Sequence, residues 1–245
     1  MPARPAQRLM AGLRGAVMDD RDGPLPAMLV ALTVLAGVVD ASSILRLGHV
    51  FVATMTGNLV FVGLAFAGAR GFAVLPCLFS IAGFILGALA GGRACRAGRS
   101  HRARALRNVL GIKLAVAAVV TAVVLVVGSY PGAGVRDALI VMLAMSMGAQ
   151  LAAIRYLKVP DLLTVVLTLT ITGALTERGL GLFHPVVLRR AIAVLAFAVG
   201  AVSGALLVLN VGLVAALGFG LAIIVGVSVA ANRASRSCDD WTASR

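Results

Sequence analysis

Charged residues are scarce in this sequence, and acidic residues are the scarcest of them. Only 13% of the 245 residues are Asp, Glu, Lys or Arg, and Asp and Glu together number nine. Soluble domains are about 25% charged and about 45–50% apolar, whereas this chain is 60% hydrophobic with a mean hydropathy of +1.03. The composition therefore excludes an ordinary soluble domain. It predicts an all-α, polytopic membrane bundle in contact with the lipid bilayer, with residues 1–245 forming a single membrane domain.

Cysteine and histidine are also few, with three residues of each. Cys77, Cys95 and Cys238 are too far apart for a disulfide framework or a zinc site to be inferred from their spacing. The sequence contains no HExxH motif, and its glycine-rich stretches fall inside apolar runs instead of forming phosphate-binding loops. We therefore expect no metal, no cofactor and no catalytic residues, and we do not expect an enzyme.

Positive charge, in contrast, is abundant, and the net charge is +13. Nucleic-acid binding could account for such a charge, but the arginines are clustered between apolar runs. Residues 93–107 hold six arginines and no acid, and four more arginines precede residue 22. Short cytoplasmic loops of membrane proteins collect Lys and Arg in this way. We therefore expect no nucleic-acid partner, and we expect residues 1–24 and 232–245 to be cytoplasmic tails.

The number of membrane spans follows from run length and from this charge distribution. The apolar runs cover residues 25–45, 50–67, 72–91, 109–128, 138–154, 162–175, 186–209 and 211–231. A membrane-spanning helix needs about 20 residues, and rarely fewer than about 17. The second and sixth runs are the weakest candidates, because polar residues interrupt both and the sixth is short. All basic clusters fall on one side only if neither run crosses.

The sequence thus predicts six transmembrane helices plus two short broken or re-entrant segments, the first break lying at Thr54–Asn58. Non-helical backbone at membrane depth is tolerated where protein buries it or where it lines a water-filled cavity. The alternative is that the second run is a kinked ordinary span in which Asn58 bonds to a neighbouring helix.

The two halves of the chain are similar in the order of their elements. Residues 37–45 and 148–156 hold corresponding positions, and each half contains three full spans. An odd number of spans inserts the second half upside down. We therefore predict an inverted 3+3 repeat of residues 25–128 and 138–231, an arrangement that is common in secondary transporters.

Small residues recur every fourth position in the third and seventh runs. They are Gly83, Gly87 and Gly91, and Ala196, Gly200 and Gly204. This spacing lets two helix backbones approach closely. Such ladders could close the bundle internally or join two copies of the chain, so a homo-oligomer remains an open alternative.

Two segments resemble a known family. GVVDASSILRLGHVFVATMTGNLVF (residues 37–61) and MGAQLAAIRYLKVPDLLTVVLT (residues 147–168) are similar to segments of the YoaK-like family of bacterial integral membrane proteins. The resemblance covers about residues 28–230. It implies about six spans in the bacterial inner (plasma) membrane, and it implies no activity, because the family is one of unknown function. Leu169 stands where the family favours Gly, so we expect the sixth run to be more regularly helical than the second.

Polar residues inside the apolar runs are the candidates for a functional site. Asp40 lies in the first span, where ionisable residues are rare and commonly line ion or substrate pathways. Asp40 could instead pair with Arg46 or cap the break. Gln150 could bind substrate or bridge two helices. The predicted substrate-binding or pathway residues are Asp40, Thr54, Thr56, Gly57, Asn58, Gln150, Thr164 and Thr168.

These residues favour a transporter or channel for a small solute or ion that the sequence does not identify. Asp40 is a candidate proton carrier, so proton coupling is part of this hypothesis. The alternative function is that of a non-transporting membrane scaffold or signalling protein, acting through the basic loop. A scaffold needs no acid, amide and hydroxyl groups in its interior.

Overall fold

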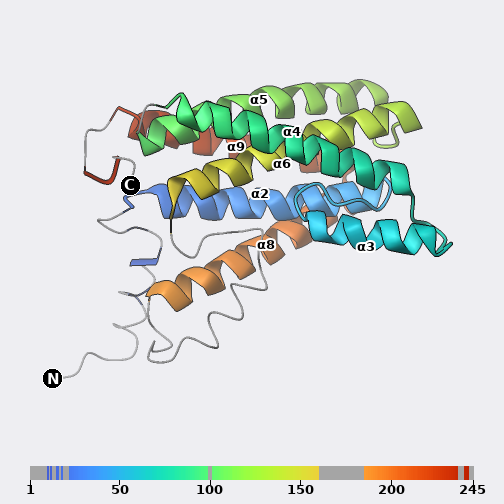
Figure 1. Cartoon of the computed structure of the whole chain (residues 1–245), viewed down its shortest axis with the longest axis horizontal. Helices are drawn as coiled ribbons and strands as arrows, with labels where there is room; N and C mark the ends of the chain where they lie inside the picture. Colours follow the sequence, from blue (N-terminus) through green and yellow to red (C-terminus); the bar gives the residue numbers. More distant parts are fainter. Residues whose placement is uncertain are drawn as a thin grey trace.

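A computed structural model gives the chain seven α-helices and one short 3-10 helix within the residues that it describes. These are residues 22–98, 101–159, 185–236 and 240–242, together with residues 10, 12, 15, 16 and 18. The helices are α2 (Leu25–Arg46), α3 (Met55–Phe66), α4 (Val74–Arg96), α5 (Arg102–Val127), α6 (Ala133–Leu157), α8 (Pro185–Asn210), α9 (Leu213–Ala234) and η1 (Asp240–Thr242). They run along the longest axis of the molecule as a bundle, with α2 inside it (Figure 1).

Six of these helices are long and apolar enough to cross a membrane: α2, α4, α5, α6, α8 and α9. They contain 22–26 residues each. At a rise of 1.5 Å per residue they are about 33–39 Å long, which exceeds the roughly 30 Å hydrocarbon core. The prediction of a polytopic bundle with six long apolar helices is confirmed. Helix α3 has 12 residues and a length of about 18 Å, which is too short to cross.

The interruption of the second run lies earlier than Thr54–Asn58. Residues 47–54 are non-helical, whereas Thr56, Gly57 and Asn58 belong to the first turn of α3. Gly48 (φ 92°) and His49 (φ 55°) both adopt positive φ, and this reverses the chain at the end of α2. The predicted position was wrong because glycine is tolerated in a helix, so Gly57 is no reliable marker of a break.

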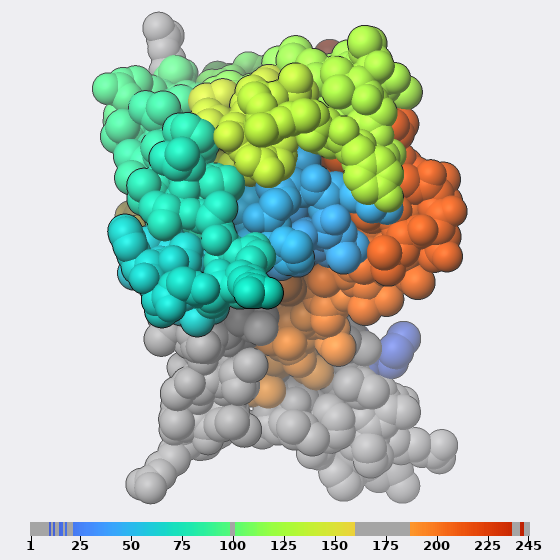
Figure 2. Space-filling model, turned by 90° about the vertical axis from the view of Figure 1, so that its right-hand side faces the viewer, coloured from blue at the N-terminus to red at the C-terminus, as the bar shows by residue number. Residues whose placement is uncertain are grey.

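After this reversal the chain runs back along α2, and α3 returns towards the same end of the bundle (Figure 1). Within this stretch Leu47, Val50 and Val52 are fully buried. Figure 2 shows the end of α2 and the residues that follow it in the centre of this end, with other helices around them. Neighbouring helices therefore surround the non-helical stretch from the sides (Figure 2), while His49 within it is exposed.

Two helix pairs pack at very short range through glycines. Gly87 of α4 lies against Met145 of α6, and Gly200 of α8 lies against Val34 of α2, so closely that a Cβ on either glycine would collide with a backbone carbonyl. Similar contacts pair Gly83 with Val141, Gly91 with Ala149, Gly204 with Val38, Gly37 with Phe197 and Ala201, and Gly148 with Phe84 and Ala88. Both glycine ladders thus pack helices of the same chain against each other. The homo-oligomer stays a prediction.

The basic clusters gather at one end of the bundle. Arg102, the first residue of α5, pairs with Asp22 at 2.8 Å and donates to the carbonyl of Leu157, the last residue of α6, at 2.6 Å. Arg107 donates to Ser235 Oγ, just after α9, at 3.4 Å. The start of α2, the start of α5 and the ends of α6 and α9 therefore share one end, and the connection between α5 and α6 lies at the other (Figure 1). This is the parity expected if the second run does not cross.

The sixth run, which holds the second predicted break, falls within residues 160–184, outside the described residues. Thr164 and Thr168 lie in this range, so their assignment to the site stays a prediction.

Candidate functional site

Asp40 binds the chain that follows the reversal. Its side chain is buried, and Oδ1 accepts the backbone N–H groups of Val52 at 2.8 Å and Ala53 at 2.7 Å. Oδ2 accepts the hydroxyl of Thr54 at 2.7 Å. These donors immediately precede α3, where a carboxylate also interacts favourably with the positive end of the helix dipole. Of the alternatives for Asp40, the structure therefore contains the capping interaction.

The other structural alternative for Asp40 is an ion pair with Arg46, but Arg46 is held by different partners. Arg46 Nη1 donates to the hydroxyl of Tyr130 at 2.6 Å, and its guanidinium lies over the Tyr130 ring at 4.4 Å from the centroid. Arg46 therefore serves to tie the end of α2 to the connection between α5 and α6.

Asn58 binds the same non-helical stretch from the other side. Its Oδ1 accepts the N–H of Phe51 at 2.8 Å, and its Nδ2 donates to the Phe51 carbonyl at 2.7 Å. Ser80 of α4 donates its hydroxyl to that carbonyl at 2.6 Å. Both side chains are fully buried. Together with Asp40 and Thr54 they satisfy backbone groups that would otherwise be buried without partners.

We refer to Asp40, Thr54, Asn58 and Ser80 as the break cluster. Gly57 belongs beside it, because a Cβ there would collide with the ring of Phe51. Thr56 does not belong to the break cluster, because its side chain is exposed on α3. Ser80 was missed by sequence reasoning. Serine is common in membrane helices, so no local signal distinguishes Ser80 from its neighbours.

Gln150 lies apart from the break cluster. It is buried on α6, and its Nε2 donates to the carbonyl of Leu32 at 3.0 Å. Leu32 precedes Asp40 by eight residues on α2, which is about 12 Å along a helix. The structure therefore does not bring Gln150 to Asp40. Gln150 bridges α6 to α2, and its Oε1 has no hydrogen-bond partner among the described residues.

The residue that sequence reasoning missed most clearly is Lys113 of α5. Its side chain is fully buried, and its Nζ donates to Ser146 of α6, at 3.0 Å to Oγ and 3.3 Å to the carbonyl. Ser146 lies one turn before Gln150, on the same face of α6. We refer to Lys113, Ser146 and Gln150 as the lysine cluster. A signal was available, because Lys113 is a charged residue within an apolar run.

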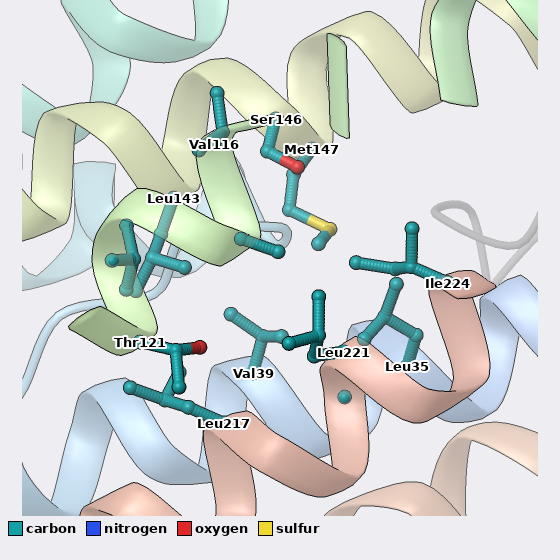
Figure 3. A pocket seen from close by; sticks show the side chains of 13 residues that line it. Leu35, Val39, Val116, Thr121, Leu143, Ser146, Met147, Leu217, Leu221 and Ile224 are labelled. Atoms are coloured by element: carbon teal, nitrogen blue, oxygen red, sulfur yellow. The ribbon is translucent and has the colours of Figure 1, made fainter. Parts of the chain in front are cut away.

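A small cavity of about 20 Å³ lies between α2, α5, α6 and α9. Ser146 lines it, whereas Lys113 and Gln150 do not. It is lined mostly by aliphatic side chains, with the hydroxyls of Ser146 and Thr121 at two of its edges (Figure 3). Thr121 Oγ1 is buried and has no partner in the described part of the chain. A cavity of this size accommodates about one water molecule.

Beside Asp40 there is a second, open space. It is an apolar groove of about 390 Å³ between α2, Phe51 and α8. The oxygens of Asp40 are engaged by residues 52–54, so the groove offers little polar chemistry. No group of three His, Cys, Asp or Glu residues that could hold a metal ion occurs within the described ranges.

Comparison with known proteins places this sequence in a family. The model of the family described as "Protein of unknown function (DUF1275)" matches residues 28–230. The chain belongs to the DUF1275 family. It is also 31% identical over 187 residues to "UPF0700 transmembrane protein YoaK" of Bacillus subtilis (strain 168), covering 73% of this chain and 82% of that protein. The expected relationship to YoaK-like membrane proteins is thus confirmed. No solved structure matches the chain.

Proposed function

We propose that this DUF1275 protein is a transporter or channel that moves a small solute or ion across the bacterial inner membrane. One observation carries the proposal: residues 47–54 are non-helical, run back along α2 (Figure 1), and are bound by buried side chains of the break cluster. Non-helical segments that fold back among membrane helices are characteristic of secondary transporters and of channels with re-entrant segments. A scaffold requires no such element.

The packing of the helices supports the inverted repeat that belongs to this proposal. The α4–α6 and α2–α8 pairs use glycines at matching positions. Gly87 meets Met145 as Gly200 meets Val34, and Gly91 meets Ala149 as Gly204 meets Val38. Residues 37 and 148, aligned from the sequence, make equivalent contacts with α8 and α4. Two copies of one packing unit that face each other suit alternating access.

The orientation follows from the basic end of the bundle, which we assign to the cytoplasm together with both termini. The native thiol of Cys95 is unsuitable as a probe because it is fully buried. Ala97 and Ala133 are exposed at opposite ends. With Cys238 replaced by Ser, an impermeant thiol reagent should label Ala97→Cys only in inverted vesicles and Ala133→Cys only in intact spheroplasts. Labelling of Ala97→Cys from outside would contradict the orientation.

Proton coupling through Asp40 has a specific physical form in this structure. Protonation would weaken the hydrogen bonds that Asp40 accepts from residues 52–54, and this would loosen the segment before α3. Asp40→Asn keeps an acceptor oxygen but does not titrate. We expect this variant to fold and to lose any pH dependence of flux. A pH dependence equal to that of the wild type would remove Asp40 from coupling.

Transport itself is tested with purified protein reconstituted in liposomes. Entry of a panel of small neutral solutes and monovalent salts is followed by light scattering after an osmotic step. We expect at least one solute to enter faster than into protein-free liposomes, and equally fast with Thr56→Val, an exposed change on α3. If no solute enters faster, the transporter proposal fails and the scaffold hypothesis gains.

A further inference from the structure

We propose that a groove between α5 and α9, at the basic end of the bundle, binds one anionic phospholipid of the adjoining leaflet. The groove has a volume of about 320 Å³, and its lining includes Arg107, Gly111, Leu114, Val225, Val229 and Asn232. The inference goes beyond the proposed function, because it requires only that the basic end of the bundle lies at a membrane surface and not that the protein transports a solute.

The lining of the groove changes from polar to apolar with depth. Arg107 lies about 8 Å from the start of α5, and Asn232 lies about 3 Å from the end of α9. The start of α5 and the end of α9 share the basic end of the bundle, so these two polar residues are at the mouth. Leu114 and Val225 lie about two turns deeper on their helices. A phospholipid has the same order, with a charged phosphate at the membrane surface and hydrocarbon below it.

Arg107 offers a positive charge at the mouth of the groove. Its side chain is exposed, and its hydrogen bond within the described part of the chain is the 3.4 Å contact with Ser235 Oγ. Arg107 forms no ion pair with a described residue, and neither α5 nor α9 contains an acidic residue. A guanidinium has five N–H donors and binds phosphate oxygens well. Basic groups between membrane helices are typical of headgroup sites on the cytoplasmic side.

Gly111 keeps the apolar part of the groove open. A Cβ on Gly111 would meet no atom within 4 Å, so close helix packing does not require a glycine here. This differs from Gly87 and Gly200, where a Cβ would collide with a neighbouring backbone. The open space continues between Leu114 and Val225, and a hydrocarbon chain suits such a lining. Free phosphate would leave this apolar surface uncovered, so we assign the groove to a lipid and not to a soluble anion.

The experiment is native mass spectrometry of the full chain released from detergent, with phosphatidylglycerol or phosphatidylethanolamine added at equal concentrations. The wild type should bind one phosphatidylglycerol several-fold more tightly than one phosphatidylethanolamine, because only the first has a net negative charge. The same spectra separate monomers from dimers. Equal affinity for the two lipids would overturn the proposal.

Arg107→Gln tests the headgroup contact. The variant should fold, because the side chain is exposed, and it should lose the preference for phosphatidylglycerol. Arg93→Gln is the matched control, since Arg93 is an exposed arginine near the end of α4, at the same end of the bundle, and does not line the groove. An unchanged preference in Arg107→Gln, or an equal loss in Arg93→Gln, would overturn the site.

Gly111→Leu tests the acyl-chain contact by filling the groove. The Cβ has room, and leucine favours a helix more than glycine does, so this variant should fold. It should weaken the first binding step of both lipids several-fold. Gly226→Leu is the matched control, because Gly226 of α9 is also exposed, also has room for a Cβ, and does not line the groove.

Two results with Gly111→Leu would contradict the lipid site. Undiminished binding of phosphatidylglycerol would mean that no acyl chain occupies the groove. A wild-type dimer that Gly111→Leu separates, without any lipid preference, would assign the groove to a second copy of the chain.

Discussion

Asp40 and Lys113 are both ionisable, both buried, and both located in membrane-spanning helices, yet their surroundings differ. Asp40 accepts three hydrogen bonds from residues 52–54. Lys113 contacts one neutral serine. The first charge is matched to its own chain, whereas the second is not matched by any acid within the described residues.

This difference separates two roles that a sequence presents identically. A carboxylate whose oxygens bind backbone N–H groups stabilises an irregular segment, and its contribution is architectural unless it titrates. A buried lysine without an anionic partner is costly to keep charged, and its hydrogen bonds to neutral groups offset only part of that cost. Intramembrane charge alone therefore does not identify a ligand site, and the partners of that charge must be known.

Asp40→Ala is the change with the largest expected effect. It leaves the N–H groups of Val52 and Ala53 and the hydroxyl of Thr54 buried without their acceptor. Each such group costs about 1–3 kcal/mol, so the free energy of unfolding should fall by about 3 kcal/mol or more. The measurement is thermal unfolding in detergent, followed by the reactivity of Cys77 and Cys95.

Thr56→Val is the matched control for that variant, because Thr56 lies two residues after Thr54, on α3, and is exposed. Its effect should remain within about 0.5 kcal/mol. Equal stability of Asp40→Ala and Thr56→Val would mean that Asp40 does not hold the break.

The contrast between the two charged residues also shows which structural features can be predicted from local sequence. Six long apolar helices and an interrupted second run are predictable, because run length, polar interruption and charge bias are local properties. The position of the break was not predictable from Gly57 and Asn58, since Gly48 and His49 make the reversal. The partners of Asp40 lie twelve to fourteen residues away, and only the folded chain reveals these contacts.

The same limit applies to the lysine cluster. Averaging hydropathy over an apolar run conceals a single charged residue. The run that contains Lys113 is therefore predicted to be an ordinary apolar span. Its contact with Ser146 crosses from α5 to α6, and helix pairing is not evident from periodicity. Gln150 was found from its polarity, but its neighbours were not, because they depend on which face of α6 meets α2.

Ser80→Ala sharpens the comparison with an intermediate effect. Ser80 donates to the carbonyl of Phe51, which also accepts from Asn58, so the carbonyl keeps one partner. We expect a loss of about 1 kcal/mol in the same unfolding assay. A loss as large as that of Asp40→Ala would mean that the contact between α4 and the break matters as much as the cap.

Lys113→Met should destabilise the protein least among the three changes at buried residues. Methionine has a similar length and an apolar end, and volume-conserving changes in a core usually cost under about 1.5 kcal/mol. The two hydrogen bonds to Ser146 are lost, but so is the cost of burying an amine without a counter-charge. Replacing buried charges by apolar side chains is often neutral or stabilising. We therefore expect unchanged or increased stability, in contrast to Asp40→Ala.

If Lys113→Met instead unfolds the protein as strongly as Asp40→Ala does, Lys113 is architectural in the same sense as Asp40, and the distinction between the two charges fails.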